Sequence, residues 1–198
     1  LARACAETGT KLVAFSTDLV FDGAKAAPYV ESDEPHPLSE YGRTKADAEA
    51  TILTAAESAL VVRTAAFFGE HDDYNFVTRT LRALIAGDEC VAASDVVVSP
   101  TYVSDLVHAV LDLALDNERG LWHLTSDGAL TWEELARRAA RMARVTAASL
   151  RGVPLAELRL PAARPKFSAL TSERGWIMPP IDHALARYAR SCAWERTS

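Results

Sequence analysis

The stretch 11-KLVAFSTDLVFDG-23 decides the fold, because it changes character halfway along its length. It begins as an apolar run, which is typical of a strand buried on both faces of a parallel sheet. It then turns polar at Ser16, Thr17 and Asp18, and a turn pair, Asp22-Gly23, follows. Ligand sites in open parallel sheets lie beyond the carboxyl ends of the strands. The three polar residues are therefore candidates for a site, and a plain turn at the end of a strand is the alternative.

Strand and helix patterns alternate along most of the 198 residues. Strand candidates occur at 11–16, 59–65, 89–94 and 120–126, and helix patterns at 41–56, 75–86, 102–116, 131–144 and 181–191. This alternation predicts an α/β fold with a Rossmann-like, mostly parallel sheet flanked by helices. Thr131 and Glu134 form a capping-box pattern that sets the start of one helix. The Pro-rich stretch 149–180 is predicted to be an irregular, wrapping tail.

Charge and composition argue against several classes of protein. The net charge of -6 disfavours a nucleic-acid partner, so the basic run RRAARMAR (137–144) is interpreted as a solvated helix face. The three cysteines have no CxxC spacing, which argues against a disulfide framework and against a zinc site. The sequence contains no apolar run of membrane-spanning length and no signal-peptide pattern. We therefore expect a cytoplasmic protein without nucleic-acid or membrane partners.

Two clusters contain the residue types of metal ligands. The run 71–73 (His-Asp-Asp) lacks a fourth ligand at a recognisable spacing, so we interpret it as a solvated turn. Asp105, His108 and Asp112 share one helix face, which is typical of the wet side of an amphipathic helix. The sequence therefore predicts no metal site.

Tyr41 and Lys45 lie four residues apart in PLSEYGRTKADAEA (37–50), at the start of a predicted helix, and so share one face. A phenol is a poor acid at neutral pH, but a neighbouring ammonium favours its phenolate form. The pair is a candidate proton donor together with the cation that tunes it. A Tyr-Lys pair on a solvated helix surface is the alternative.

The run FSTDLVFDGAKAAPYVESDEPHPLSEYGRTKADAE (15–49) resembles the extended short-chain dehydrogenase/reductase family, and specifically its dTDP-4-dehydrorhamnose reductase branch. The stretches VVRTAAFFG (61–69), SPTYVSDLVHAV (99–110) and RPKFSAL (164–170) extend the resemblance. It implies that the chain is the C-terminal two-thirds of such a reductase, with a small irregular C-terminal region on the substrate side.

The resemblance also implies an internal division and a missing part. Residues 1–198 would be a single-domain fragment, with 1–88 as the catalytic Rossmann remainder and 89–198 as mainly the substrate-side part. The family's glycine-rich dinucleotide turn is absent from the sequence, and LARACAETGTK (1–11) reads as the end of a helix that stops at Gly9. We expect the chain to be covalently continuous with an N-terminal Rossmann segment. A homo-oligomer is compatible with the resemblance.

The implied reaction is the reduction of a nucleotide-linked 4-keto-6-deoxy sugar with NADP or NAD as cofactor. Tyr41 would protonate the ketone while a hydride arrives from the nicotinamide, and Lys45 would hold the nicotinamide ribose. Thr17 would bond the reacting oxygen, with Asp18 as its helper. Ser16, Tyr41, Lys45 and Thr64 are then expected to contact the cofactor, and Thr17, Asn75, Ser99 and Thr101 the substrate. Plain helix capping is the alternative for Asn75, and an ordinary helix entry is the alternative for the stretch 99–101.

Two departures and two alternatives accompany this hypothesis. The family commonly has Ser-Trp where this chain has Ala65-Ala66, so a stacking wall beside the sugar is lost. Dehydratases of the same scaffold place a second acid after Asp18, where this chain has Leu19, so reduction is preferred. A non-catalytic regulatory subunit, similar to the beta subunit of methionine adenosyltransferase, is the alternative function.

Overall fold

The centre of the fold is a three-stranded parallel sheet in the order β1-β2-β7. Its strands are β1 (Val13–Thr17), β2 (Leu60–Thr64) and β7 (Gly120–His123). The register pairs Thr17 with Thr64, so β1 and β2 end at the same level. All of β2 is buried, as expected of an inner parallel strand. The Rossmann-like, mostly parallel sheet predicted from the sequence is confirmed.

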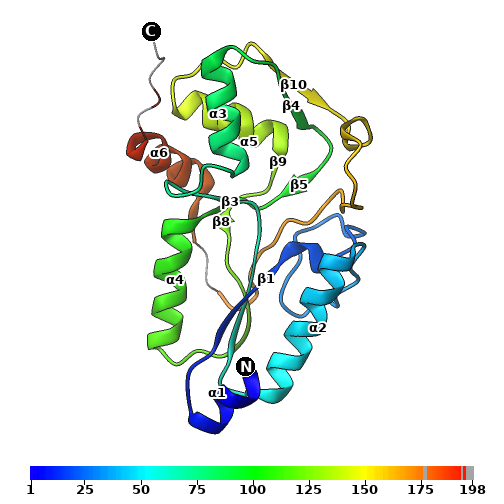
Figure 1. Ribbon diagram of the computed structural model, residues 1–198, viewed down its shortest axis with the longest axis vertical. Coiled ribbons are helices and arrows are strands. Elements are labelled where there is room, and N and C mark those ends of the chain that lie inside the picture. Colours follow the sequence, from blue (N-terminus) through cyan, green and yellow to red (C-terminus); the bar gives the residue numbers. More distant parts are fainter. Residues whose placement is uncertain (176–177, 193, 195–198) are drawn as a thin grey trace.

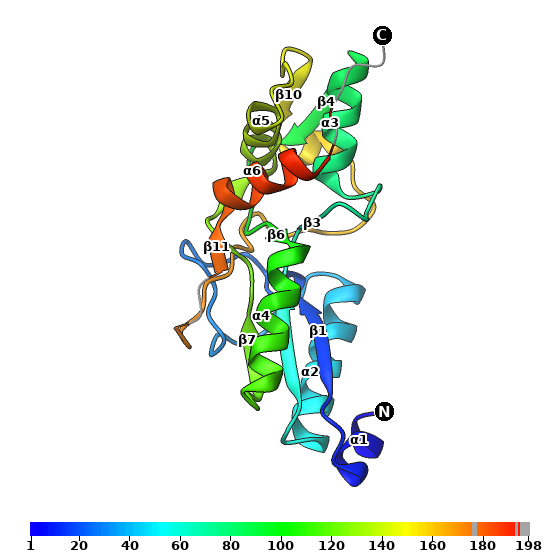
Figure 2. The ribbon, with the colours of Figure 1, turned by 90° about the vertical axis from the view of Figure 1, so that its left-hand side faces the viewer.

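Helices cover both faces of this sheet in the computed structural model, which describes residues 1–175, 178–192 and 194 (Figures 1 and 2). Helix α2 (Glu40–Ala55) lies on one face, and α4 (Val103–Leu115) packs its buried leucines against β2 and β7 on the other. Helix α1 (Ala2–Thr8) lies at the far end of this lobe and stops at Gly9, whose φ is 67°. The helix end expected there is confirmed.

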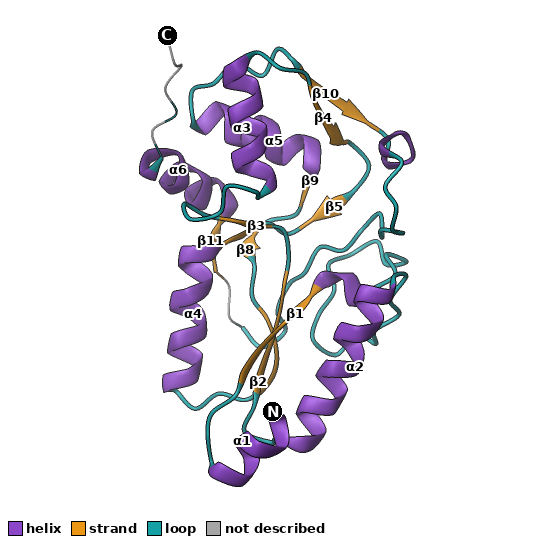
Figure 3. Ribbon diagram, viewed as in Figure 1, coloured by secondary structure: helices purple, strands orange, loops and turns teal. Residues whose placement is uncertain are grey.

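A second lobe lies beyond the carboxyl end of the sheet (Figure 3). It packs α3 (Phe76–Ala86), α5 (Trp132–Met142) and α6 (Ile181–Ser191) against a parallel strand pair, β4 (Cys90–Ala93) and β10 (Leu150–Val153). The Thr131 capping box starts α5 as predicted. The remaining elements are the short strands β3 (Phe67–Phe68), β5 (Val97–Val98), β6 (Thr101–Tyr102), β8 (Ser126–Asp127), β9 (Leu130–Thr131) and β11 (Met178–Pro180), and the 3-10 turns η1 (Asp18–Val20) and η2 (Leu155–Leu158).

The two lobes do not correspond to the two sequence ranges 1–88 and 89–198. The strand predicted at 89–94 does not join the central sheet, because β4 pairs with β10 from the stretch predicted to be irregular. Helix α3 precedes residue 88 yet packs in the second lobe, whereas α4 and β7 follow it and complete the first. Each lobe is thus built from both sides of the division at residue 88.

The segment 166–171 crosses between the lobes as an extended chain. On one side, Val97 N donates to Lys166 O at 2.8 Å, and Ser168 N donates to Val97 O at 2.9 Å. On the other side, Tyr29 N donates to Ala169 O at 2.8 Å. Backbone bonds on both sides fix this segment firmly, although it belongs to the Pro-rich tail.

A buried ion pair joins α2 to the sheet. Arg63, 2% exposed, donates from Nη2 to Oε2 of Glu49 at 2.6 Å and from Nε to Oε1 at 2.9 Å. Arg63 Nη1 also lies 3.3 Å from Nε2 of His123. Burial lowers the pKa of His123, so the ring is neutral. Because a guanidinium only donates, Nε2 accepts and Nδ1 donates to Thr171 O at 2.9 Å.

Gly42 lets α2 approach η1 closely. A Cβ at position 42 would lie 2.2 Å from Leu19 O and 2.9 Å from the Cβ of Pro37. The contact is with backbone, which has no free torsion to move away. Gly42 therefore sets the distance between the start of α2, where Tyr41 lies, and the end of β1.

We predict that Gly42→Ala lowers the free energy of unfolding by about 2 kcal/mol, because overpacking costs more than helix propensity returns. Urea unfolding measures the effect. Thr51→Ala, on the exposed face of the same helix, serves as the propensity control and should leave stability equal or higher. A Gly42→Ala protein as stable as the parent would contradict the close approach.

We predict that Glu49→Ala costs about 3 kcal/mol of stability, because it leaves the Arg63 guanidinium buried without its anion. The double variant Glu49→Leu, Arg63→Met should recover most of that loss in the same urea experiment. Glu40→Ala removes the exposed Glu40–Arg43 pair and should be close to neutral. Equal effects of the two Glu substitutions would argue against a structural role for the buried pair.

Candidate active site

A cleft of about 640 Å³ lies between the lobes, where β1 and β2 end. The sheet lobe contributes mainly polar residues to its lining: Ser16, Thr17, Asp18, Tyr41 and Thr64. The second lobe contributes mainly apolar ones, among them Phe76, Val91, Val96, Trp132 and Leu155. Arg164, Pro165 and Ser168 line it from the tail, at and just before the crossing segment. Five residues predicted to form the site thus border one cavity.

Thr17 ends β1 and caps the turn η1 that follows. Its Oγ1 accepts a hydrogen bond from Leu19 N at 3.2 Å and donates one to Oδ1 of Asp18 at 3.1 Å. The strand end is therefore also the ST turn that the sequence offered as an alternative. Thr17 is therefore both the residue that forms the ST turn and a residue that borders the cleft.

Asp18 is a buried carboxylate whose hydrogen-bond partner lies far away in the sequence. Ser168 Oγ donates to its Oδ2 at 2.6 Å, so each carboxylate oxygen accepts from a hydroxyl. Burial raises the pKa of Asp18, and the bonds from Ser168 and Thr17 oppose that rise because they favour the ionised form. The positive charge of Arg164 acts in the same direction as these bonds.

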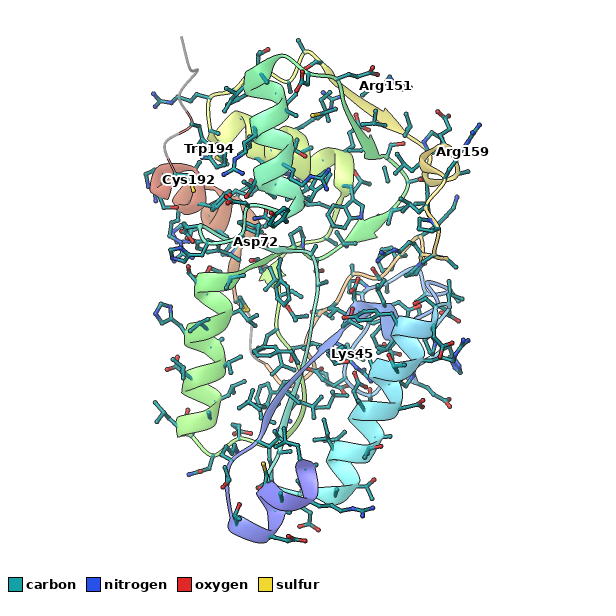
Figure 4. The ribbon with its side chains drawn as sticks, viewed as in Figure 1. Lys45, Asp72, Arg151, Arg159, Cys192 and Trp194 are labelled. Atoms are coloured by element: carbon teal, nitrogen blue, oxygen red, sulfur yellow. The ribbon has the colours of Figure 1, made fainter. Side chains whose placement is uncertain are left out.

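Tyr41 and Lys45 share the face of α2 that looks toward the end of β1. The Tyr41 side chain is 52% exposed and borders the cleft. Lys45 Nζ donates to Phe15 O at 3.0 Å and lies 5.9 Å from the centroid of the Tyr41 ring. Lys45 accordingly appears between α2 and β1 in Figure 4. One helix thus presents a phenol with a cation beside it at the cleft that Thr17 also borders.

Ser16 and Thr64 border the cleft from neighbouring strands. The Oγ of Ser16 is buried and has no hydrogen-bond partner within the described part of the chain. An unpartnered buried hydroxyl is costly, so a bound group would relieve it. Thr64 Oγ1 instead donates to Oγ1 of Thr101 at 3.1 Å.

Three predicted substrate contacts lie outside the cleft lining. Asn75 caps α3, with Oδ1 accepting from Thr78 N at 2.9 Å and Nδ2 donating to Asp72 O at 2.6 Å. Ser99 is buried and its Oγ bonds both backbone groups of Leu170. Thr101 is buried beneath Thr64. For Asn75, the geometry is that of the capping alternative.

Sequence reasoning assigned no role to Arg164 or Ser168, which border the cleft from the C-terminal tail. Both belong to RPKFSAL (164–170), the stretch that carries part of the family resemblance. The motif could have indicated that these residues matter, but a sequence motif does not show which side chains Arg164 and Ser168 contact.

The departure at Ala65-Ala66 forms part of the cleft wall. Ala66 has a φ of 43°, in the left-handed region that residues with a Cβ rarely adopt. Its carbonyl accepts from Thr101 N at 3.2 Å, which helps to hold this bend. A methyl group thus stands where the family commonly has a ring.

The structure contains no cluster of three or more His, Cys, Asp or Glu side chains, among the residues it describes, that would hold a metal ion. The His71–Asp73 run lies in a turn in which Asp72 Oδ1 accepts from Tyr74 N at 2.8 Å. Asp105 is buried and pairs with Arg187 of α6, so the interpretation as the wet side of a helix is wrong for Asp105, whereas His108 and Asp112 are exposed. Within the described ranges, no helix has the length and apolar character needed to cross a membrane.

Similar proteins of known structure have the same fold. A crystal structure of dTDP-4-dehydrorhamnose reductase from Bacillus anthracis in complex with NADP superposes with a TM-score of 0.91 at 30% identity, covering 96% of this chain and 69% of that one. A dTDP-glucose 4,6-dehydratase from the same organism, in complex with NAD, has a TM-score of 0.80 at 16% identity and shares the fold alone.

Proteins with similar sequences include reductases of the same kind. The dTDP-4-dehydrorhamnose reductase of Mycobacterium tuberculosis is 37% identical over 99% of this chain and 69% of its own length. A dTDP-4-keto-6-deoxy-D-glucose reductase of Streptomyces niveus is 33% identical over 92% of this chain and 64% of its own. The chain therefore spans about two-thirds of the length of such relatives. The family model described as the RmlD substrate binding domain matches residues 1–178, and the chain belongs to that family.

Proposed function

We propose that this chain is the catalytic and substrate-binding part of a reductase that converts the ketone of a nucleotide-linked 4-keto-6-deoxy sugar to an alcohol, with NADP or NAD as cofactor. The observation that carries the proposal is that Thr17 and Tyr41, from different elements, border one cleft with Lys45 beside the phenol. The relatives named as reductases of such sugars support the substrate class.

The proton of the reaction comes from Tyr41 in this proposal. Its phenol donates to the ketone oxygen as the carbon receives the hydride that a nicotinamide supplies when bound. Lys45, held at Phe15 O, places a positive charge where it stabilises the phenolate that remains. Thr17 orients the reacting oxygen from the strand end, which is a rigid support.

The residues present fit a nicotinamide cofactor. An ammonium has three donors, and Lys45 spends one on Phe15 O, so it retains donors for ribose hydroxyls. The buried Ser16 Oγ lacks a partner among the described residues and borders the same cleft. Thr64 faces the cavity from the next strand. These residues would hold the reactive end of the cofactor.

The opposite wall suits the rest of a sugar nucleotide. Phe76 and Trp132 meet edge to face with centroids 4.8 Å apart, and both border the cleft. An aromatic wall of this kind packs against a base or a sugar. Arg164 carries the one positive charge among the described residues that line the cleft, and it would attract a phosphate group. The small side chains Ala65 and Ala66 leave space beside the sugar.

We also propose that a Rossmann segment completes the sheet at β1 and is covalently continuous with this chain. In the described residues, no strand pairs with the outer edge of β1. Phe15, on the α4 side of that strand, is 46% exposed. Val107, Leu111 and Leu115 form an exposed apolar stripe at helical spacing on α4. An open parallel edge beside apolar side chains is a surface that a further βα unit would bury.

The three cysteines are free, which is consistent with a reducing compartment, and we propose the cytoplasm as the location. We also keep the division of the chain at residue 88 as a proposal about function. Residues 1–88 supply the catalytic groups Thr17, Tyr41 and Lys45. Residues 89–198 supply most of the apolar wall and Arg164.

We predict that Tyr41→Phe in the full-length protein lowers kcat for reduction of a dTDP-4-keto-6-deoxy sugar by at least about 100-fold, because the ketone loses its general acid. The oxidation of NADPH or NADH, followed by absorbance, measures the rate. The binding of the cofactor should change little, since the ring remains.

Tyr74→Phe is the matched control, because Tyr74 is an exposed tyrosine in a loop outside the cleft lining. Its kcat should equal that of the parent. If Tyr41→Phe reduced the sugar at the parent rate, the assignment would fail. A parent protein that binds the cofactor but turns over no keto sugar would favour the regulatory subunit instead.

A further inference from the structure

The Asp18 carboxylate is held by two hydroxyls of unequal strength. Ser168 Oγ donates to Oδ2 at 2.6 Å, which is short and typical of a bond to a charged acceptor. Thr17 Oγ1 donates to Oδ1 at 3.1 Å, beyond the usual range for a bond between two oxygens. Ser168 is therefore the stronger partner, and Thr17 is bound only loosely.

The proton count at Thr17 makes this difference important. A hydroxyl has one proton to donate, and Oδ1 of Asp18, 3.1 Å from Thr17 Oγ1, is the acceptor that takes it in the structure. To stabilise a reacting ketone oxygen, Thr17 must turn its proton away from Asp18. The cost of turning is small only if another donor keeps the buried carboxylate satisfied.

Ser168 is fixed well enough to be that donor. Its side chain is buried, and its N–H donates to Val97 O at 2.9 Å. The next residue, Ala169, accepts from Tyr29 N at 2.8 Å. The hydroxyl is thus held against Asp18 by backbone bonds to both lobes and does not depend on a mobile loop.

We propose that Ser168 is a positioning residue for the reduction: by holding Asp18, it frees the Thr17 hydroxyl to turn to the reacting oxygen. This inference rests on the proposed function. Ser168 acts through Asp18 and Thr17 and has no contact of its own with the ketone. Without Ser168, Thr17 becomes the sole hydroxyl partner that the buried carboxylate has among the described residues, and it is withdrawn from the substrate.

The first test compares Ser168→Ala with the parent in the full-length protein, using reduction of a dTDP-4-keto-6-deoxy sugar. We expect kcat to fall about tenfold, since one hydrogen bond of the transition state is weakened. KM should change less than about twofold, because the bond matters in the transition state and not in substrate binding. In a Thr17→Val background, Ser168→Ala should lower kcat by less than about twofold.

Ser172→Ala is the matched control. Ser172 lies four residues further along the same chain and donates to a carboxylate, Oε1 of Glu31, at the same distance of 2.6 Å. Glu31 lies outside the cleft lining. Both Ser→Ala variants should lose similar thermal stability, but only Ser168→Ala should lower kcat.

A second measurement needs no turnover. Titration of the carboxyl carbons by NMR, without substrate, should show a higher pKa for Asp18 in Ser168→Ala than in the parent, because a bond that favours the ionised form is gone. The positive charge of Arg164, which lowers the pKa of Asp18, is unchanged in the variant.

The two proposals fail separately. If Ser168→Ala kept the parent kcat while Tyr41→Phe abolished reduction, the positioning role would be overturned and the function would stand. An equal loss of kcat in Ser172→Ala would also overturn it. If the parent reduced no keto sugar, the function would fail, and an unchanged Asp18 titration would then overturn the Ser168 contact as well.

Discussion

The parallel pairing of β1 with β2 is the constraint on which the site depends. Its register places Thr17 opposite Thr64, so two strands deliver hydroxyls to one edge of the sheet. Helix α2 is then drawn to the same edge by two contacts of opposite kind: the buried ion pair of Glu49 with Arg63, and the close backbone approach that Gly42 permits. A shift of the register by one residue would place Thr17 opposite Arg63 or Ala65, so the hydroxyls of Thr17 and Thr64 would no longer end at the same level.

The two walls of the cleft differ in the kind of side chain that they contribute. Most groups able to move or orient a proton come from the sheet lobe, where buried strands and a docked helix hold them rigidly. The second lobe supplies mainly apolar and aromatic side chains, which exclude water and provide a surface for stacking. Substitutions in the second lobe, or at Ala65 and Ala66, can therefore alter which ligand fits the cleft without disturbing Thr17, Tyr41 or Lys45.

Much of this arrangement was predictable from the sequence, because it follows from local periodicity. The apolar run that ends at Phe15 predicts a strand and its polar end, and the spacing of Tyr41 and Lys45 predicts one helix face. The expected burial of that strand on both faces is wrong for the described residues, because β1 lies at the edge of the sheet and Phe15 is exposed. The partner of Asp18 was not predictable, because Ser168 lies 150 residues away and no pattern near either residue encodes their contact. The pairing of β4 with β10 was not predicted for the same reason, because the sequence of a four-residue strand does not indicate which distant strand it pairs with. Asn75 shows a further limit: the same residue type suits a helix cap and a ligand contact.

The crossing segment explains why so distant a residue can serve the site. It bonds through its backbone to Val97 in the second lobe and to Tyr29 in the first, so it spans the boundary as an added strand would. Backbone bonds fix position more strictly than side-chain contacts, because they leave few torsions free. The width of the cleft and the place of the Ser168 hydroxyl are thus set by the same bonds. A change in the angle between the lobes would shift Ser168 relative to Asp18, and would reach Thr17 through the carboxylate without any movement of β1.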